Sequence, residues 1–240
     1  MQKEEKTGAT GLSVKQICGV CSLEPECIPW NLGDAHRGRL DGIIEHPPLL
    51  NEGEHLFQSG ENLTTVYVVR TGAFKTYVFD SEEHEHVLGF SLPGELLGFD
   101  GVYPRVHGCN AVALQDSAVC ALPYFDFASL MKRAAGLREQ ILQLASPGFS
   151  DRVIYSSLST EARLARFLMD LSRRTSNHAD SSVIFELPMP LLDIASFLRV
   201  TPQDIDRLFA YYMNEGIISL SASRMQLKDP DRLDQIARGK

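Results

Sequence analysis

The chain has 240 residues, five of them cysteine, and a formal net charge of −8. This length accommodates one or two domains with their own cores, and no apolar stretch approaches the roughly 20 residues of a transmembrane helix. The negative charge lies entirely in residues 1–158, because residues 159–240 carry 11 basic and 11 acidic side chains. The composition therefore shows no broad basic surface for nucleic acid, but it leaves room for a small motif that docks locally.

Three cysteines lie close together near the start of the chain. Cys18, Cys21 and Cys27 are spaced C-x2-C-x5-C in the polar, irregular residues 1–30, and Cys120 follows 93 positions after Cys27. Thiolates bind iron–sulfur clusters, zinc or cuprous ion. A cubane cluster takes four cysteines, whereas zinc sites usually combine two close pairs. The spacing therefore favours an iron–sulfur centre and leaves zinc as the alternative.

The fifth cysteine, Cys109, is expected to be a small core side chain. The chain shows no hydrophobic signal sequence, so we expect a cytoplasmic protein without structural disulfides. It contains no Ser/His/Asp triad, Walker loop or zinc-protease motif, and we predict no enzymatic activity.

Short β-rich runs divided by glycine turns fill residues 49–122. Regular short strands with such turns predict a barrel or jelly roll. His84 and His86 fall in a charged turn between two runs, where a solvated hairpin tip is expected and a metal site is the alternative. The expected strands are residues 64–70, 73–79, 86–90, 110–114 and 117–122.

The hydrophobic spacing becomes helical from Pro123 onward. Residues 160–172 are expected to form an amphipathic helix. Ser146-Pro147-Gly148 interrupts the region before it, and a proline inside a helix costs ~3 kcal/mol. The apolar face of the 160–172 helix consists of Leu164, Phe167, Leu168 and Leu171.

Residues 190–199 and 203–213 are expected to form two helices joined by a tight turn. Thr201 is a natural N-cap for the second helix, and Pro202 suits its first position. A hairpin follows, and this order predicts a winged helix-turn-helix whose second helix enters the DNA major groove. The expected hairpin strands are residues 217–220 and 224–227.

Several short motifs accompany these features. They are the four cysteines Cys18, Cys21, Cys27 and Cys120, then Cys27-Ile-Pro29, Phe90-Ser-Leu-Pro-Gly-Glu-Leu-Leu-Gly-Phe-Asp100, Ala111-Val-Ala-Leu114, Cys120-Ala-Leu-Pro123 and Leu171-Ser-Arg-Arg174. Together they resemble the CRP/FNR superfamily of bacterial transcription regulators, and within it the oxygen-sensing fumarate and nitrate reduction (FNR) type.

The resemblance covers nearly the whole chain and implies an α+β fold in four parts. These are an N-terminal cluster-ligand segment (1–30), a β-roll (jelly-roll) sensory domain (31–134), a connecting dimerisation helix (135–158) and a C-terminal winged helix-turn-helix DNA-binding domain (159–240).

The resemblance also implies a function. Such proteins hold a [4Fe–4S] cluster without oxygen, here through Cys18, Cys21, Cys27 and Cys120. As homodimers they bind palindromic promoter DNA, activate transcription and recruit RNA polymerase; oxygen converts the cluster and releases the DNA. The alternatives are a cluster-free or zinc-binding regulator of the same fold and an iron–sulfur electron-transfer protein.

The expected DNA-reading residues are Thr201, Gln203, Asp206 and Arg207, which depart from the family pattern of Glu, then Ser and Arg. Arg207 suits guanine, and glutamine suits adenine rather than cytosine. Asp206 has two interpretations: it contacts a base, or it is a solvated charge or helix partner for Arg207.

Two further departures concern the dimer helix and the sensory domain. Pro147-Gly148 falls where the family has one long dimerisation helix. Pro93-Gly-Glu95 resembles part of the phosphate cassette of cyclic-nucleotide relatives, but Arg105-Val-His-Gly108 does not supply the arginine and hydroxyl pair that they use. No cyclic nucleotide is therefore expected.

Overall fold

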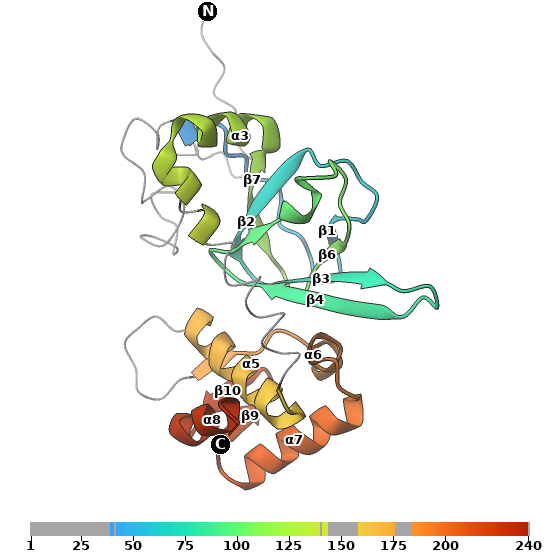
Figure 1. Ribbon diagram of the computed structural model, residues 1–240, viewed down its shortest axis with the longest axis vertical. Coiled ribbons are helices and arrows are strands. Elements are labelled where there is room, and N and C mark those ends of the chain that lie inside the picture. Colours follow the sequence, from blue (N-terminus) through green and yellow to red (C-terminus); the bar gives the residue numbers. More distant parts are fainter. Residues whose placement is uncertain (1–38, 41, 140, 144–157, 176–183, 240) are drawn as a thin grey trace, which may run out of the picture. The chain divides into compact units, whose positions relative to one another are not determined.

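The computed structural model describes residues 39–40, 42–139, 141–143, 158–175 and 184–239. They belong to two compact units, drawn in Figure 1. The first unit contains the described residues before Phe79 and those from Phe90 to 143, and the second contains Phe79–Gly89 and the described residues from 158 onward. Each unit has its own core and is treated separately.

Two antiparallel sheets of short strands make up the β-roll (Figure 1). Their residues belong to the first unit, apart from those in Phe79–Gly89, which belong to the second. One sheet has the order β1-β6-β3-β4 and the other the order β5-β2-β7. This is the β-roll that the strand pattern predicts. The strands are β1 (His55–Phe57), β2 (Thr65–Thr71), β3 (Phe74–Phe79), β4 (Glu85–Ser91), β5 (Leu96–Leu97), β6 (Asn110–Ala113) and β7 (Ala118–Pro123).

The five strands expected from the sequence are all present, with ends that differ by a residue or two. The short strands β1 and β5 were not predicted, because two or three residues are too few to show an alternating pattern. Between β2 and β3, Gly72 adopts φ of 84°, and a Cβ there would overlap the side chain of Ser117. Only glycine fits this turn, which brings the two sheets together.

Helix α3 (Tyr124–Arg133) follows β7 directly. It ends at Ala134, whose backbone is extended (φ −117°, ψ 93°), and the chain is helical again over residues 135–139 and 141–143. Leu137 and Ile141 are buried with Cys120 in one hydrophobic cluster. The expected interruption at Ser146-Pro147-Gly148, like most of the expected dimerisation helix, lies outside the described residues.

The second unit contains the predicted helix-turn-helix and wing (Figure 1). Its three-stranded sheet has the order β8-β10-β9. The predicted apolar face of α5 is fully buried. Strand β8 and helix α8 were not predicted. The elements are α5 (Thr160–Thr175), β8 (Ile184–Glu186), α6 (Leu191–Leu198), α7 (Pro202–Asn214), β9 (Ile218–Ser221), β10 (Arg224–Leu227) and α8 (Pro230–Ala237).

Among the described residues, no helix combines the length and the apolar character that crossing a membrane requires.

Candidate DNA-reading helix and cluster-ligand site

Helix α7 begins where the sequence predicts. Thr201 is its N-cap with extended backbone, Pro202 occupies the first turn, and the Thr201 hydroxyl accepts a hydrogen bond from the Asp204 amide at 3.2 Å. The same hydroxyl donates to Asp204 Oδ2 at 2.7 Å. The Thr201 hydroxyl thus satisfies one backbone donor at the helix start and also bonds the side chain at the third position.

The turn before α7 contains a non-glycine residue in the left-handed conformation. Arg199 adopts the left-handed conformation (φ 55°, ψ 51°) at the C-cap of α6, a position that usually takes glycine. The Arg199 and Val200 amides donate back to the carbonyls of Ser196 and Ala195. Ala195 itself is buried, at 1% exposed.

The predicted base-reading side chains Gln203, Asp206 and Arg207 are exposed on α7, while Ile205 and Leu208 on its other face are buried. Of the interpretations of Asp206, the structure shows an exposed charge and no ion pair with Arg207. Arg207 Nη1 instead lies 3.4 Å from Asp204 Oδ1, one turn earlier. Adjacent residues on a helix point in different directions, whereas residues three apart are neighbours.

Two hydrogen bonds fix the helix-turn-helix to α5. Arg163 Nη1 donates to the Leu198 carbonyl at 3.1 Å, at the end of α6. The Tyr212 hydroxyl of α7 donates to the Glu161 carbonyl at 2.9 Å, and burial raises the pKa of Tyr212, so the hydroxyl keeps its proton. Neither contact follows from a local sequence pattern, because the partners lie 35 and 51 positions apart.

The second site contains the one predicted cluster ligand that the structure describes. Cys120 lies on β7 opposite Val68 of β2 and is 9% exposed. Cys18, Cys21 and Cys27 lie outside the described residues. Cys109, expected to be a core residue, is 5% exposed.

His46 lies beside Cys120 and was not predicted as a site residue. Its Nδ1 is 3.7 Å from Cys120 Sγ. Burial, and to a smaller extent the charge of Arg70, lower the pKa of His46, so the ring is neutral at pH 7. In the part of the chain that the structure describes, the buried Nε2 of His46 has no hydrogen-bond partner.

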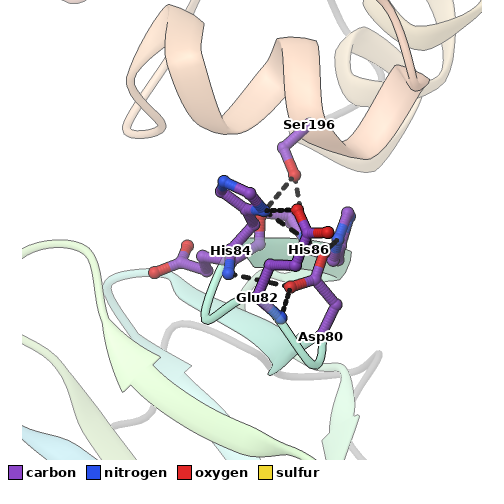
Figure 2. Close-up of polar contacts among 7 residues, drawn as sticks. Asp80, Glu82, His84, His86 and Ser196 are labelled. Atoms are coloured by element: carbon purple, nitrogen blue, oxygen red, sulfur yellow. Dashed lines mark hydrogen bonds and ion pairs between the residues drawn. The ribbon is translucent and has the colours of Figure 1, made fainter.

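The charged hairpin turn after β3 has the solvated character predicted for it. Figure 2 shows Asp80 at its centre, with His86 Nε2 at 2.7 Å and His84 Nδ1 at 3.5 Å from Oδ2. The hydrogen bond with His86, followed by those from the His84 and Glu82 amides, holds the pKa of the Asp80 carboxyl well below its usual range. Among the described residues, no group of three His, Cys, Asp or Glu side chains is arranged to hold a metal ion.

The start of β4, which follows this turn and belongs to the second unit, contacts α6. The Ser196 hydroxyl accepts from the Val87 amide at 3.0 Å and lies 3.3 Å from the Glu85 carbonyl, to which it donates (Figure 2). Strand β4 is at the edge of its sheet, and residues two apart in a strand direct their polar backbone groups to the same side. A single hydroxyl therefore satisfies one donor and one acceptor of an exposed strand edge.

In the region that resembles a cyclic-nucleotide cassette, the charged side chains of Glu95 and Arg105 bond to other groups of the same unit. Glu95 Oε2 accepts a hydrogen bond from the Leu92 amide at 3.1 Å. The Arg105 guanidinium lies over the rings of Tyr124 and Phe125, at 4.6 Å and 5.8 Å from their centroids. Arg105 also has a positive φ of 64°. Both charged side chains are therefore directed to partners within the unit.

Comparison with known proteins identifies both parts of the architecture. The cyclic nucleotide-binding domain family matches residues 49–134, and the Crp-like helix-turn-helix domain family matches residues 162–236. The Fumarate and nitrate reduction regulatory protein of Escherichia coli strain K12 is 33% identical over 224 residues, which cover 92% of this chain and 90% of that protein. Electron transport regulator A of Shewanella oneidensis is 32% identical over 239 residues, which cover 98% and 95%.

Solved structures show the same fold. FixK2 from Bradyrhizobium japonicum superimposes with a TM-score of 0.71 at 20% identity, over 80% of this chain and 96% of that one. A CooA mutant from Carboxydothermus hydrogenoformans gives a TM-score of 0.65 at 16% identity, over 82% and 88%.

Proposed function

The chain belongs to the Crp/FNR family of transcription regulators, and on this premise we propose that it is an oxygen-responsive regulator that holds a [4Fe–4S] cluster through Cys18, Cys21, Cys27 and Cys120. Its relatives are regulators rather than enzymes. We further propose that it acts in the cytoplasm as a homodimer, binds promoter DNA in the absence of oxygen and contacts RNA polymerase there.

The position of Cys120 is the observation that carries the cluster assignment. Its sulfur lies on β7 beside the segment that enters the first unit from the N-terminal side, where Glu45 pairs with Ala121. Leu40 lies thirteen positions after Cys27, enough to span more than about 40 Å when extended. The three N-terminal thiols can therefore reach Cys120.

The chemistry of the donor set fits the same centre. Four thiolates satisfy a cubane cluster, and such a cluster, when bound, supplies an oxygen-sensitive centre. Cys120 would hold it from a rigid strand, and the other three cysteines from residues 1–30. The name of the Escherichia coli relative supports the assignment, since it describes fumarate and nitrate reduction.

The exposed start of α7 supports DNA reading in the major groove. Gln203 and Arg207 are the side chains that we propose contact bases, and Thr201 holds the start of the helix in place. Asp206 is exposed beside them and would either accept a hydrogen bond from a cytosine amino group or remain in solvent.

A cyclic nucleotide is not part of the proposal. A phosphate needs a guanidinium directed toward it, and that of Arg105 stacks on Tyr124 and Phe125 instead. Glu95 is likewise held by its own turn. An electron-transfer role would leave the helix-turn-helix without a purpose.

Anaerobic purification followed by metal and sulfide analysis tests the proposal. We expect about four irons and four sulfides per chain, as a cubane requires. Cys120→Ser, and serine at Cys18, Cys21 or Cys27, should abolish or severely weaken cluster binding. Cys109→Ser is the matched control, because it makes the same change at a buried cysteine that the proposal does not use, and it should keep the cluster.

Stoichiometric zinc without sulfide in the anaerobic protein would replace the proposal with the zinc-binding regulator. Neither zinc nor iron, together with specific DNA binding, would identify a cluster-free regulator of the same fold.

A further inference from the structure

His46 and Cys120 are brought together by a short antiparallel pairing. The Glu45 and Ala121 backbones exchange both hydrogen bonds at 2.8 Å. The next residues along, His46 and Cys120, are therefore opposite each other at a non-hydrogen-bonded position, where facing side chains approach most closely. The 3.7 Å separation of Nδ1 and Sγ follows from this register.

The sequence around His46 fixes the contact. A residue before proline is restricted to extended conformations, and His46 precedes Pro47. Pro47 and Pro48 have no amide hydrogen, so the pairing is interrupted after His46 and resumes only at Leu50, which pairs with Ser117 just before β7. His46 is thus the residue of this segment that faces Cys120, and the paired stretch ends with it.

The second observation is the buried Nε2 of His46, which has no partner among the described residues. Burying a polar atom without a hydrogen bond costs free energy, so such atoms usually have a reason. A neutral imidazole carries one N–H, and the nitrogen that bonds its neighbour decides where that hydrogen lies.

The chemistry of a ligating cysteine settles which nitrogen donates. A thiolate bound to iron can only accept a hydrogen bond, so the hydrogen must be on Nδ1. Nε2 then carries no hydrogen. Leaving this nitrogen without a partner costs less free energy than burying an unsatisfied N–H would. Hydrogen bonds to cluster sulfurs stabilise the more reduced state and raise the reduction potential.

We propose that His46 is a positioning residue for the fourth cluster ligand: its Nδ1–H donates to Cys120 Sγ, orients the thiolate and makes the cluster harder to oxidise. The inference rests on the proposed function, since it assigns a partner to one ligand of that cluster. It adds a residue that lies 74 positions from Cys120 and belongs to none of the cysteine motifs.

Three substitutions of His46 distinguish a hydrogen bond to Cys120 from a contribution of side-chain bulk alone. His46→Asn places an amide N–H close to the position of Nδ1 and should keep the bond. His46→Gln places its amide near the position of Nε2, too far along the side chain to serve Sγ in the same way. His46→Leu keeps bulk and removes every donor.

The measurements are the reduction potential of the anaerobic protein and the rate at which its visible absorbance is lost in air-saturated buffer. We expect His46→Leu and His46→Gln to shift the potential to more negative values and to lose the cluster about fivefold faster, the effect of one net hydrogen bond. His46→Asn should match the wild type in both. If Leu and Gln variants cannot hold a cluster at all, retention by the Asn variant with the wild-type potential gives the same support.

Two results would overturn the inference. One is a wild-type potential and rate in all three variants, and the other is an equal change, or equal loss of the cluster, in all three. Wild-type protein without iron and sulfide would instead contradict the proposed function, so the two failures are distinguishable.

Discussion

The charge pairing of Arg207 bears directly on DNA reading. Its guanidinium lies 3.4 Å from the Asp204 carboxylate, and the Arg207 side chain is 76% exposed. Ion pairs at such exposed sites contribute little, on the order of 0–1 kcal/mol. Asp204 therefore orients Arg207 at the start of α7 through a weak contact, which the guanine of the proposed DNA complex would replace.

At the residue scale we predict that Arg207→Ala weakens specific DNA binding by about 1–3 kcal/mol, because a bidentate contact to guanine is lost. Arg207→Lys is the matched control: it keeps the charge but cannot form the two parallel bonds. It should retain salt-dependent binding while losing discrimination at one base. Site selection on randomised duplexes with each variant measures both effects, and selection of the wild-type sequence with wild-type affinity by both would show that Arg207 reads no base.

At the scale of the element, α7 is held at both ends by contacts of different kinds. The Thr201 cap and Pro202 start the helix, and Tyr212 attaches its last turns to α5 through the Glu161 carbonyl. The turn between α6 and α7 has a non-glycine residue, Arg199, in the left-handed conformation. Because no glycine marks the turn, the Thr201 N-cap is the clearest local signal for where α7 begins.

We predict that Thr201→Ala lowers the free energy of unfolding of the second unit by about 1 kcal/mol, since it removes the cap of the Asp204 amide. Thr201→Ser keeps a hydroxyl at the same position and should retain most of the stability. Denaturant unfolding followed by circular dichroism compares the three proteins. Equal midpoints for the Ala and Ser variants would show that the cap hydroxyl does not stabilise α7.

At the scale of the whole molecule, Cys120 and the helices after β7 share one core. Cys120 is buried in the same cluster as Leu130, Leu137 and Ile141, and residues 135–143 begin the region where we expect the dimer contact. A ligand that binds one assembly state better shifts the population toward it. A cluster on Cys120 is therefore well placed to influence the packing of this region.

We predict that exposure to air weakens both dimerisation and DNA binding. A coupling of about 1–3 kcal/mol would change the dimer affinity by roughly 5–150-fold. Sedimentation of anaerobic and air-exposed protein over a concentration series gives the two dissociation constants. Identical constants would exclude oxygen control through assembly, and the Cys109→Ser protein should respond to air as the wild type does.

The sequence by itself determined the elements and their order. Alternating strands, a helical apolar face and cap residues are local signals, so the roll strands, α5 and the start of α7 were predicted within a few residues. Strands of two or three residues such as β5 carry no period and were missed. Most of the expected dimerisation helix and three of the four proposed ligands lie outside the described residues, so those predictions stand as predictions.

Only the tertiary structure decided which distant side chains meet. The Tyr212 hydroxyl of α7 meets the Glu161 carbonyl of α5, 51 positions away, because the packing of the two helices brings them together. His46 faces Cys120 because a single backbone pair, Glu45 with Ala121, fixes the register of two segments far apart in sequence. Local patterns record backbone preference, whereas contacts of this kind depend on strand register and helix packing, which the folded chain alone sets.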